Sequence, residues 1–161
     1  MFEVLVYVFS RYVENDAQID QDTLKKELID AGFGGYDVED AFAWITQLEE
    51  MAKQVFVIDN FSHDNTRFRI FTPSELKKLS LDSINFLLLL ERTKVLGLEQ
   101  RELAIDRAMA LPQREINVDE MRWIVQWVLW SFDRSIIGHE RLNQYVFVKN
   151  AIYPEELQSL H

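Results

Sequence analysis

Residues 117–133, NVDEMRWIVQWVLWSFD, predict the helix around which the chain is organised. At helical spacing three indoles fall within a stripe of about 60°, namely Trp123, Trp127 and Trp130. Other apolar residues cover most of the remaining circumference, which is typical of a buried helix. Asn117 followed three residues later by Glu120 forms a capping-box pattern, so the start of the helix is well marked.

The tryptophan stripe has two interpretations, a hydrophobic core or a stacking platform for bases or a cofactor. Stacking platforms for nucleic acids lie beside basic residues, whereas Arg122 is the one cation inside this segment. We therefore interpret the stripe as core, around which other helices must pack.

The composition of the 161 residues indicates a globular protein, with 48% hydrophobic and 12% aromatic residues and no cysteine. Without cysteine there is no disulfide, thiolate metal site or cysteine nucleophile. The apolar run Phe86–Leu90 is far shorter than the roughly 20 residues that span a bilayer. The N-terminal stretch MFEVLVYVF lacks the basic region and cleavage site of a signal peptide. These features predict a cytoplasmic protein that does not enter the membrane.

Negative charge is concentrated in the N-terminal part of the chain. Residues 1–66 contain 14 acidic and 4 basic side chains, whereas residues 67–161 contain 13 of each. Such a potential repels phosphate backbones and favours a partner with a basic surface. The alternative is a solvated acidic face that keeps the protein soluble.

Periodicity predicts three helices, then a hairpin, then further helices. Apolar spacing indicates a helix over residues 2–13, a second from Asp20 or Asp22 to Gly32, and a third that begins at Asp37. The β-branched and aromatic segments Val55–Ile58 and Arg67–Phe71 predict a β-hairpin. Helices with apolar faces then follow to the end of the chain.

The fold class that we predict is mainly α. Three helices and a hairpin give a winged-helix-like acidic unit over residues 1–72. Thr72-Pro73-Ser74-Glu75 marks the start of the next helix. An all-helical unit over residues 73–161 is then expected to pack around the helix at 117–133.

Several motifs in this order resemble the Smg family, a set of bacterial proteins without an assigned function. The motifs follow the opening MFEVLVYVF and span nearly the whole chain, at Leu24–Phe33, Asp37–Ile45, Arg69–Glu75, Phe86–Leu111 and Ile116–Trp130. The resemblance supplies no catalytic residue, but it implies an association with DNA processing, near whose proteins members are often encoded. The chain departs from the family pattern at Val55–Asn65.

The chemistry of the third helix argues against direct nucleic-acid binding. A recognition helix needs Arg, Lys, Asn or Gln toward bases and phosphates. Here five carboxylates face the single cation Lys53. A wing could offer only Arg67 and Arg69. Residues 24–45 are also similar to ubiquitin-associated three-helix modules in their Gly32-Phe33 turn, although a helix C-terminus explains that pair equally well.

Catalytic and metal-binding patterns are weak. Glu99, Glu102 and Asp106 share one helix face and could hold a divalent cation, but a solvated acidic face is the simpler interpretation. No nucleophile is identifiable beside any of the histidines, which are His63, His139 and His161. We therefore predict no enzyme, no cofactor and no metal.

The function that we predict is an adaptor or regulatory module that binds another protein. The expected contact surface is the acidic side of the second and third helices, with Glu27, Asp30, Asp37, Asp40 and Glu49. The alternative is a winged-helix protein associated with DNA processing or transcription.

Overall fold

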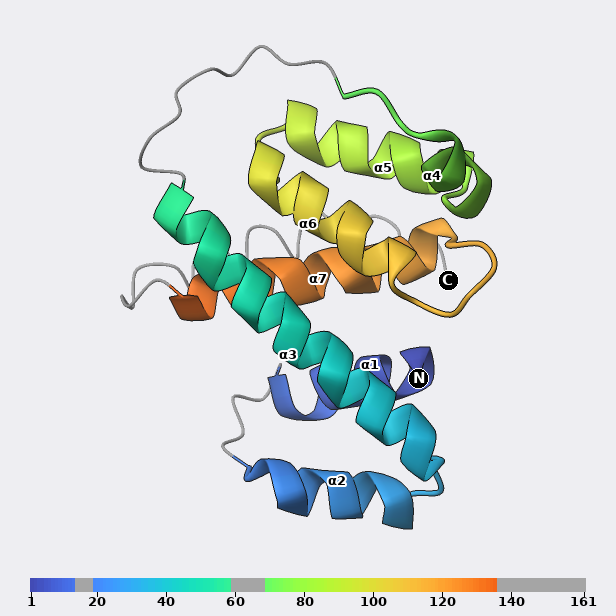
Figure 1. Cartoon of the computed structure of the whole chain (residues 1–161), viewed down its shortest axis with the longest axis vertical. Coiled ribbons are helices and arrows are strands. Elements are labelled where there is room, and N and C mark those ends of the chain that lie inside the picture. The colour runs from blue at the N-terminus through green and yellow to red at the C-terminus, as the bar shows by residue number, and fades with distance from the viewer. Residues whose placement is uncertain (14–18, 59–68, 136–161) are drawn as a thin grey trace, which may run out of the picture. The chain divides into compact units, whose positions relative to one another are not determined.

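The computed structural model describes residues 1–13, 19–58 and 69–135, and these residues are mainly helical (Figure 1). Contacts divide the chain into two compact units, Met1–Gln47 and Leu48–His161. The boundary lies inside one long helix, α3 (Gly35–Ile58), which therefore contributes to both units. The domain boundary that we expect between residues 72 and 73 concerns independent folding and stays a prediction.

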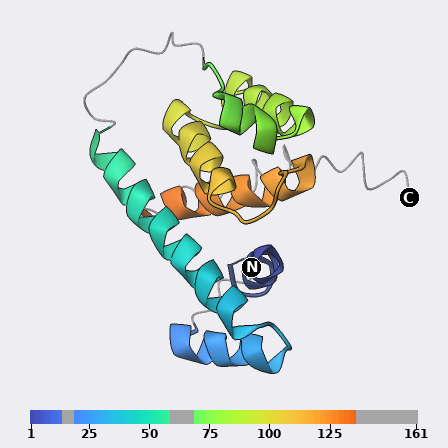
Figure 2. The ribbon, with the colours of Figure 1, turned by 45° about the vertical axis from the view of Figure 1, so that its right-hand side comes forward.

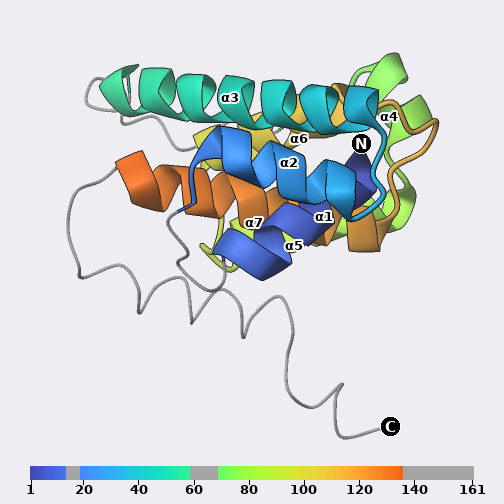
Figure 3. The same cartoon turned by 90° about the horizontal axis from the view of Figure 1, so that it is seen from below.

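The N-terminal unit consists of α1 (Phe2–Val8), a π-helical turn η1 (Phe9–Val13), α2 (Gln21–Asp30) and the first half of α3. Helices α2 and α3 run side by side in opposite directions (Figure 3). Apolar residues from all of these segments are buried, namely Val4, Leu5, Val8, Phe9, Leu24, Leu28, Val38, Ala41 and Phe42. These residues include most of the apolar stripes that the sequence predicts.

Glycine sets the turn between α2 and α3. Gly32 has φ of 101°, a left-handed conformation that a side chain would strain. Phe33 N–H donates to Leu28 O at 3.1 Å, and Gly32 N–H donates to Ile29 O at 3.0 Å. This pair of bonds is a Schellman motif, so the helix end predicted at Gly32-Phe33 is confirmed.

The C-terminal unit contains the second half of α3 with α4 (Pro73–Lys78), α5 (Leu81–Arg92), α6 (Leu98–Met109) and α7 (Val118–Ser135). Helices α5, α6 and α7 pack against one another (Figure 2). Both predicted capping boxes are present. Thr72 and Glu75 exchange bonds of 2.9 and 3.2 Å, and Asn117 and Glu120 exchange two bonds of 2.9 Å.

Backbone bonds fasten the junction of α4 and α5 to the segment that precedes α7. Ile116 N–H donates to Lys78 O at 2.7 Å, and Ser80 N–H donates to Ile116 O at 3.0 Å. The ammonium of Lys78 donates to the carbonyls of Met109, at 2.8 Å, and of Leu111. Lys78 therefore satisfies carbonyls that the end of α6 leaves without a helical partner, and burial lowers its pKa.

The β-hairpin is not found in the described residues, which contain no strand. Val55–Ile58 continue α3 instead, and residues 69–72 are extended chain that leads into α4. Val55 follows Ala52 by three residues and so extends the apolar stripe of α3. Helical periodicity therefore prevails over the β propensity of these four residues, and the winged-helix architecture is not confirmed.

The tryptophan helix is interior, as predicted. Trp127 is 1% exposed, and its ring meets that of Trp130 edge to face at 5.3 Å between centroids. Trp123 and Trp130 are half-buried. Gln126, which the sequence places in a polar strip, is buried as well. In the described residues no helix combines the length and apolar composition that crossing a bilayer requires.

Candidate functional site

Four of the five predicted partner-binding carboxylates belong to the N-terminal unit, and all four are exposed. They are Glu27 and Asp30 on α2 and Asp37 and Asp40 on α3. The fifth, Glu49, is half-buried and lies on α3 beyond the boundary of this unit. The N-terminal unit therefore carries the predicted acidic surface without Glu49.

Two of these carboxylates have partners inside the unit. The Asp37 carboxylate accepts a hydrogen bond from the N-terminal ammonium of Met1 at 2.8 Å. Asp37 was expected to cap α3, but the helix begins at Gly35, so Asp37 lies in its first turn. Glu27 accepts a short hydrogen bond from the Tyr12 hydroxyl. Burial, followed by this bond to Glu27, raises the pKa of Tyr12.

Asp30 and Asp40 remain turned to solvent, and no cation of the described residues pairs with either. Asp30 is the last residue of α2, and that turn carries no basic residue. The C-terminus of a helix holds partial negative charge, so a carboxylate at this place is slightly unfavourable. Asp30 is therefore expected to destabilise its own helix slightly.

Two apolar side chains lie exposed at the end of the unit where α2 turns into α3. Tyr36 is 92% exposed and Ile29 is 52% exposed. Lys25 pairs with Glu39 at 3.0 Å, so these two residues lie opposite each other on the antiparallel helices. Ile29 lies four residues after Lys25 on α2, and Gly35 lies four residues before Glu39 on α3. Because the helices are antiparallel, Ile29 lies opposite the first turn of α3, which contains Tyr36.

This Ile29–Tyr36 surface, flanked by Asp30 and Asp40, is the candidate functional site. Sequence reasoning selected the carboxylates but missed the two apolar residues. A signal was present, because Ile29 lies off the stripe of Leu24 and Leu28, and Tyr36 precedes the buried stripe of α3 that begins at Val38.

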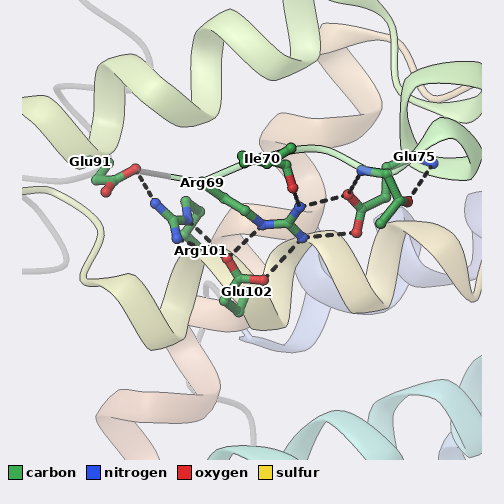
Figure 4. A network of polar contacts seen from close by, with 7 residues as sticks. Arg69, Ile70, Glu75, Glu91, Arg101 and Glu102 are labelled. Atoms are coloured by element: carbon green, nitrogen blue, oxygen red, sulfur yellow. Dashed lines mark hydrogen bonds and ion pairs between the residues drawn. The ribbon is translucent and has the colours of Figure 1, made fainter. Parts of the chain in front are cut away.

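Two of the three α6 carboxylates that were weighed as cation ligands, Glu102 and Asp106, take part in ion pairs, and Glu102 belongs to a larger network (Figure 4). Glu102 accepts hydrogen bonds from Arg69 at 2.8 and 3.1 Å and from Arg101 at 2.8 Å. Asp106 accepts one from Arg107 at 2.7 Å. Arginine hydrogens therefore occupy oxygens of Glu102 and Asp106, and among the described residues no group of three or more acidic or histidine side chains is arranged to hold a metal ion.

Arg69 occupies the centre of this network. Its guanidinium donates to both oxygens of Glu75, at 2.7 and 2.8 Å, and to the carbonyl of Ile70. The bonds to Glu75 and then Glu102 raise the pKa of Arg69. Its side chain is 13% exposed, so Arg69 is not available to bind phosphate as the wing hypothesis requires.

The pKa values of the two glutamates that pair with Arg69, Glu75 and Glu102, are lowered. The hydrogen bond from Arg69 holds the pKa of Glu75 below its ordinary value. Burial alone would raise the pKa of Glu102, but the bonds from Arg69 and Arg101 outweigh it and lower that pKa as well. Arg101 also pairs with Glu91 at 2.6 Å, so the network joins α4, α5 and α6 to the extended chain before α4.

Some of the remaining predicted residues lie outside the described part of the chain, and the others are carboxylates of α3. Arg67, His63, His139 and His161 lie outside the described residues. On α3 the carboxylates that argued against a recognition helix are where the sequence places them, and Asp37, Glu39 and Asp40 are all exposed. The described face of α3 therefore presents negative charge, which repels a nucleic-acid backbone.

Comparison with known proteins gives the family. The chain matches the family described as "Protein of unknown function (DUF494)" over residues 1–161. It is 43% identical to a "Protein Smg homolog" of Methylobacillus flagellatus, with all of both chains covered. The chain belongs to the Smg family. It is also 33% identical to "Protein Smg" of Escherichia coli strain SE11, covering 93% of this chain and 97% of the relative.

A third Smg homolog, from Shewanella halifaxensis, is 34% identical over 91% of this chain and 94% of its own. No solved structure matches the chain. Membership of the Smg family, predicted from the motifs between Leu24 and Trp130, is therefore confirmed. The printed names of these relatives denote no reaction and no ligand.

Proposed function

We propose that this Smg-family protein is a non-catalytic adaptor or regulatory module that binds another protein in the cytoplasm. The contact surface is the acidic side of α2 and α3 around Ile29 and Tyr36. The observation that supports this proposal most is the exposure of Tyr36, at 92% of the side chain. Tyrosine combines a large apolar ring with a hydroxyl and is enriched where proteins meet.

The arrangement around Tyr36 gives the partner its chemistry. An apolar centre with a charged rim is the usual organisation of a protein interface. Here the rim contributes the carboxylates of Asp30 and Asp40, both exposed. The fitting partner presents an apolar pocket surrounded by lysine or arginine, so that the ring supplies affinity and the charges accelerate encounter.

The position of Asp30 supports a role in binding over one in folding. A carboxylate in the last turn of a helix opposes the helix dipole. Asp30 and the nearby Glu27 both lie in that turn of α2. A carboxylate that does not help its own helix is available to serve a partner.

Affinity purification tests this proposal. Tagged protein is used to capture partners from native lysate, with and without nuclease, and bound proteins are identified by mass spectrometry. We expect a nuclease-resistant partner that is lost with Tyr36→Ala and with the double variant Asp30→Lys, Asp40→Lys. Direct titration of the purified partner should show weakening with salt, because exposed charges are screened.

The control for charge reversal is Glu115→Lys, which makes the same charge change as each single aspartate substitution, at an exposed position of the C-terminal unit. This control should bind like the unaltered protein. A partner whose affinity ignores Tyr36 and the two aspartates overturns the proposed surface. A partner recovered only when nucleic acid is intact favours the DNA-associated alternative, and the absence of any retained partner counts against the adaptor role.

A further inference from the structure

Helix α1 has an outer apolar face that lines an open groove of about 680 Å3 in the N-terminal unit. Phe2, Val6 and Tyr7 form its floor together with Phe33 from the α2–α3 turn. The rings of Tyr7 and Phe33 meet edge to face at 5.4 Å between centroids. These four side chains are half-buried, so the groove presents aromatic and aliphatic surface to solvent.

The inner face of the same helix is buried in the protein. Val4, Leu5, Val8 and Phe9 are each at most 4% exposed. Helix α1 is therefore apolar on two opposite sides, of which only the inner one is fully buried. A second apolar face that is wide enough to line a groove indicates a surface for another helix.

Charges at the two ends of the groove indicate what that helix is. Glu3 lies at one end and Arg11 at the other, and both are exposed residues of the groove wall. They are eight residues apart in the sequence with Tyr7 midway between them, and Arg11 belongs to the π-helical turn that continues α1. Arg11 also stands over the Tyr7 ring, with its guanidinium carbon 5.9 Å from the centroid.

The charges of Glu3 and Arg11 would pair with the same two residues of a second, antiparallel copy. If a second α1 is laid antiparallel over the first with a twofold axis near Tyr7, its residue 11 faces residue 3 of the first copy. The acidic end of each helix then meets the basic end of the other, twice in one interface. Such pairing by equivalent positions is the requirement of a twofold symmetric contact.

We propose that the α1 groove is the contact between two copies of this chain, which pair antiparallel about Tyr7. Each Glu3 forms an ion pair with Arg11 of the other protomer, and the floors of the two grooves bury each other. A single helix face buries less than the roughly 1,000 Å2 of a stable interface. The dimer is therefore weak and forms at high protein concentration or when a partner brings two copies together.

Sedimentation equilibrium tests the pairing with reciprocal charge variants. In Glu3→Arg both symmetric contacts become Arg–Arg, and in Arg11→Glu both become Glu–Glu. Each variant alone should dimerise at least about tenfold more weakly, equivalent to about 1.4 kcal/mol. An equimolar mixture of the two restores both attractive contacts, so it should form heterodimers with the affinity of the unaltered protein.

The unaltered protein is measured from about 10 μM to about 1 mM, the range in which a weak interface is populated. Lys26→Glu is the control, because it makes the same charge change as Arg11→Glu at an exposed position of α2. It should leave dimerisation unchanged. Far-UV circular dichroism checks that each variant is folded before it is compared.

The outcomes are separable from those of the adaptor proposal, because that proposal rests on Ile29 and Tyr36. A protein that stays monomeric throughout this range overturns the inference. So does a dimer that both charge variants leave intact, because that dimer uses another surface. Weakening by each single variant without recovery in the mixture equally contradicts the antiparallel pairing.

Discussion

The two units of this protein use their charged side chains differently. In the C-terminal unit arginines are drawn into the structure, with Arg101 and Arg107 only 5% and 6% exposed and each paired with a carboxylate. In the N-terminal unit the carboxylates of Asp30 and Asp40 remain in solvent, beside an exposed isoleucine and an exposed tyrosine. The first arrangement holds helices together, and the second leaves charge and apolar area for a partner.

The difference shows that composition alone does not locate function. The triad Glu99, Glu102 and Asp106 looks as suitable for ligand binding in sequence as Glu27, Asp30 and Asp40. Hydrogen bonds from Arg69 and Arg101 remove Glu102 from consideration. What distinguishes the candidate site is that no cation among the described residues pairs with Asp30 or Asp40, together with the exposure of Tyr36.

The largest contrast is expected between two aromatic residues. Trp127→Ala should lower the free energy of unfolding by about 3–5 kcal/mol, because it leaves a cavity in the C-terminal core. Tyr36→Ala should change it by less than about 0.5 kcal/mol, since the ring is exposed. Urea denaturation followed by circular dichroism measures both. Equal losses would contradict the assignment of one ring to the core and the other to a surface.

The next contrast compares an ion pair in each unit. Arg69→Met should lower the free energy of unfolding by about 2–4 kcal/mol, because it leaves Glu75 without its cation in a partly buried site and Glu102 with Arg101 alone. Lys25→Met removes the more exposed pair with Glu39, and the expected loss is at most about 1 kcal/mol. Urea titrations of both variants at neutral pH compare these values. A loss for Arg69→Met no larger than that for Lys25→Met would show that the network adds nothing beyond a surface pair.

Acid should weaken the network of the C-terminal unit. The folded protein holds the pKa of Glu75 and Glu102 below the ordinary value of 4.5. The stabilisation is therefore complete above about pH 4.5 and is lost as the pH falls through the lower, folded values. Glu102 is 46% exposed, so solvent screening limits the loss to about 1–2 kcal/mol for the pair.

Urea midpoints measured from pH 6 down to pH 3 test this expectation, with Glu75→Gln as the comparison. The amide cannot ionise, so the variant should be less stable at pH 6 and should lose less stability on acidification. A midpoint that falls equally in both proteins would assign the acid sensitivity to other carboxylates.

The sequence predicts helix starts and turns correctly where these depend on residues close to one another in the chain. The capping boxes at Thr72 and Asn117 and the turn at Gly32 were predicted because each depends on residues within a few positions of one another. The predicted hairpin is not found in the described residues, because Val55–Ile58 continue α3, in which Val55 extends the apolar stripe.

The sequence predicts the carboxylates of the candidate site but not the exposure of its apolar residues, because exposure depends on contacts between distant parts of the chain. Acidic residues can be counted in a sequence, so the sequence predicts Glu27, Asp30, Asp37 and Asp40 as surface carboxylates. Pairing across 33 positions, as between Arg69 and Glu102, leaves no periodic signal. The exposure of Tyr36 likewise depends on how α2 and α3 meet, which the sequence pattern alone does not define.

The smallest effects should come from reversing charge at the two ends of α2. Asp22 lies in the first turn, where negative charge favours the helix dipole, and Asp30 is the last residue, where it opposes the dipole. Asp22→Lys should therefore lower the free energy of unfolding, and Asp30→Lys should raise it, each by about 0.3–1 kcal/mol at low salt. Differential urea titration with and without added salt measures the pair, since salt screens both effects. If Asp30→Lys is stabilising yet abolishes partner binding, the aspartate is kept at a cost to its own helix for the sake of the contact. If instead Asp30→Lys destabilises as much as Asp22→Lys, Asp30 has a structural role and the acidic surface loses its central residue.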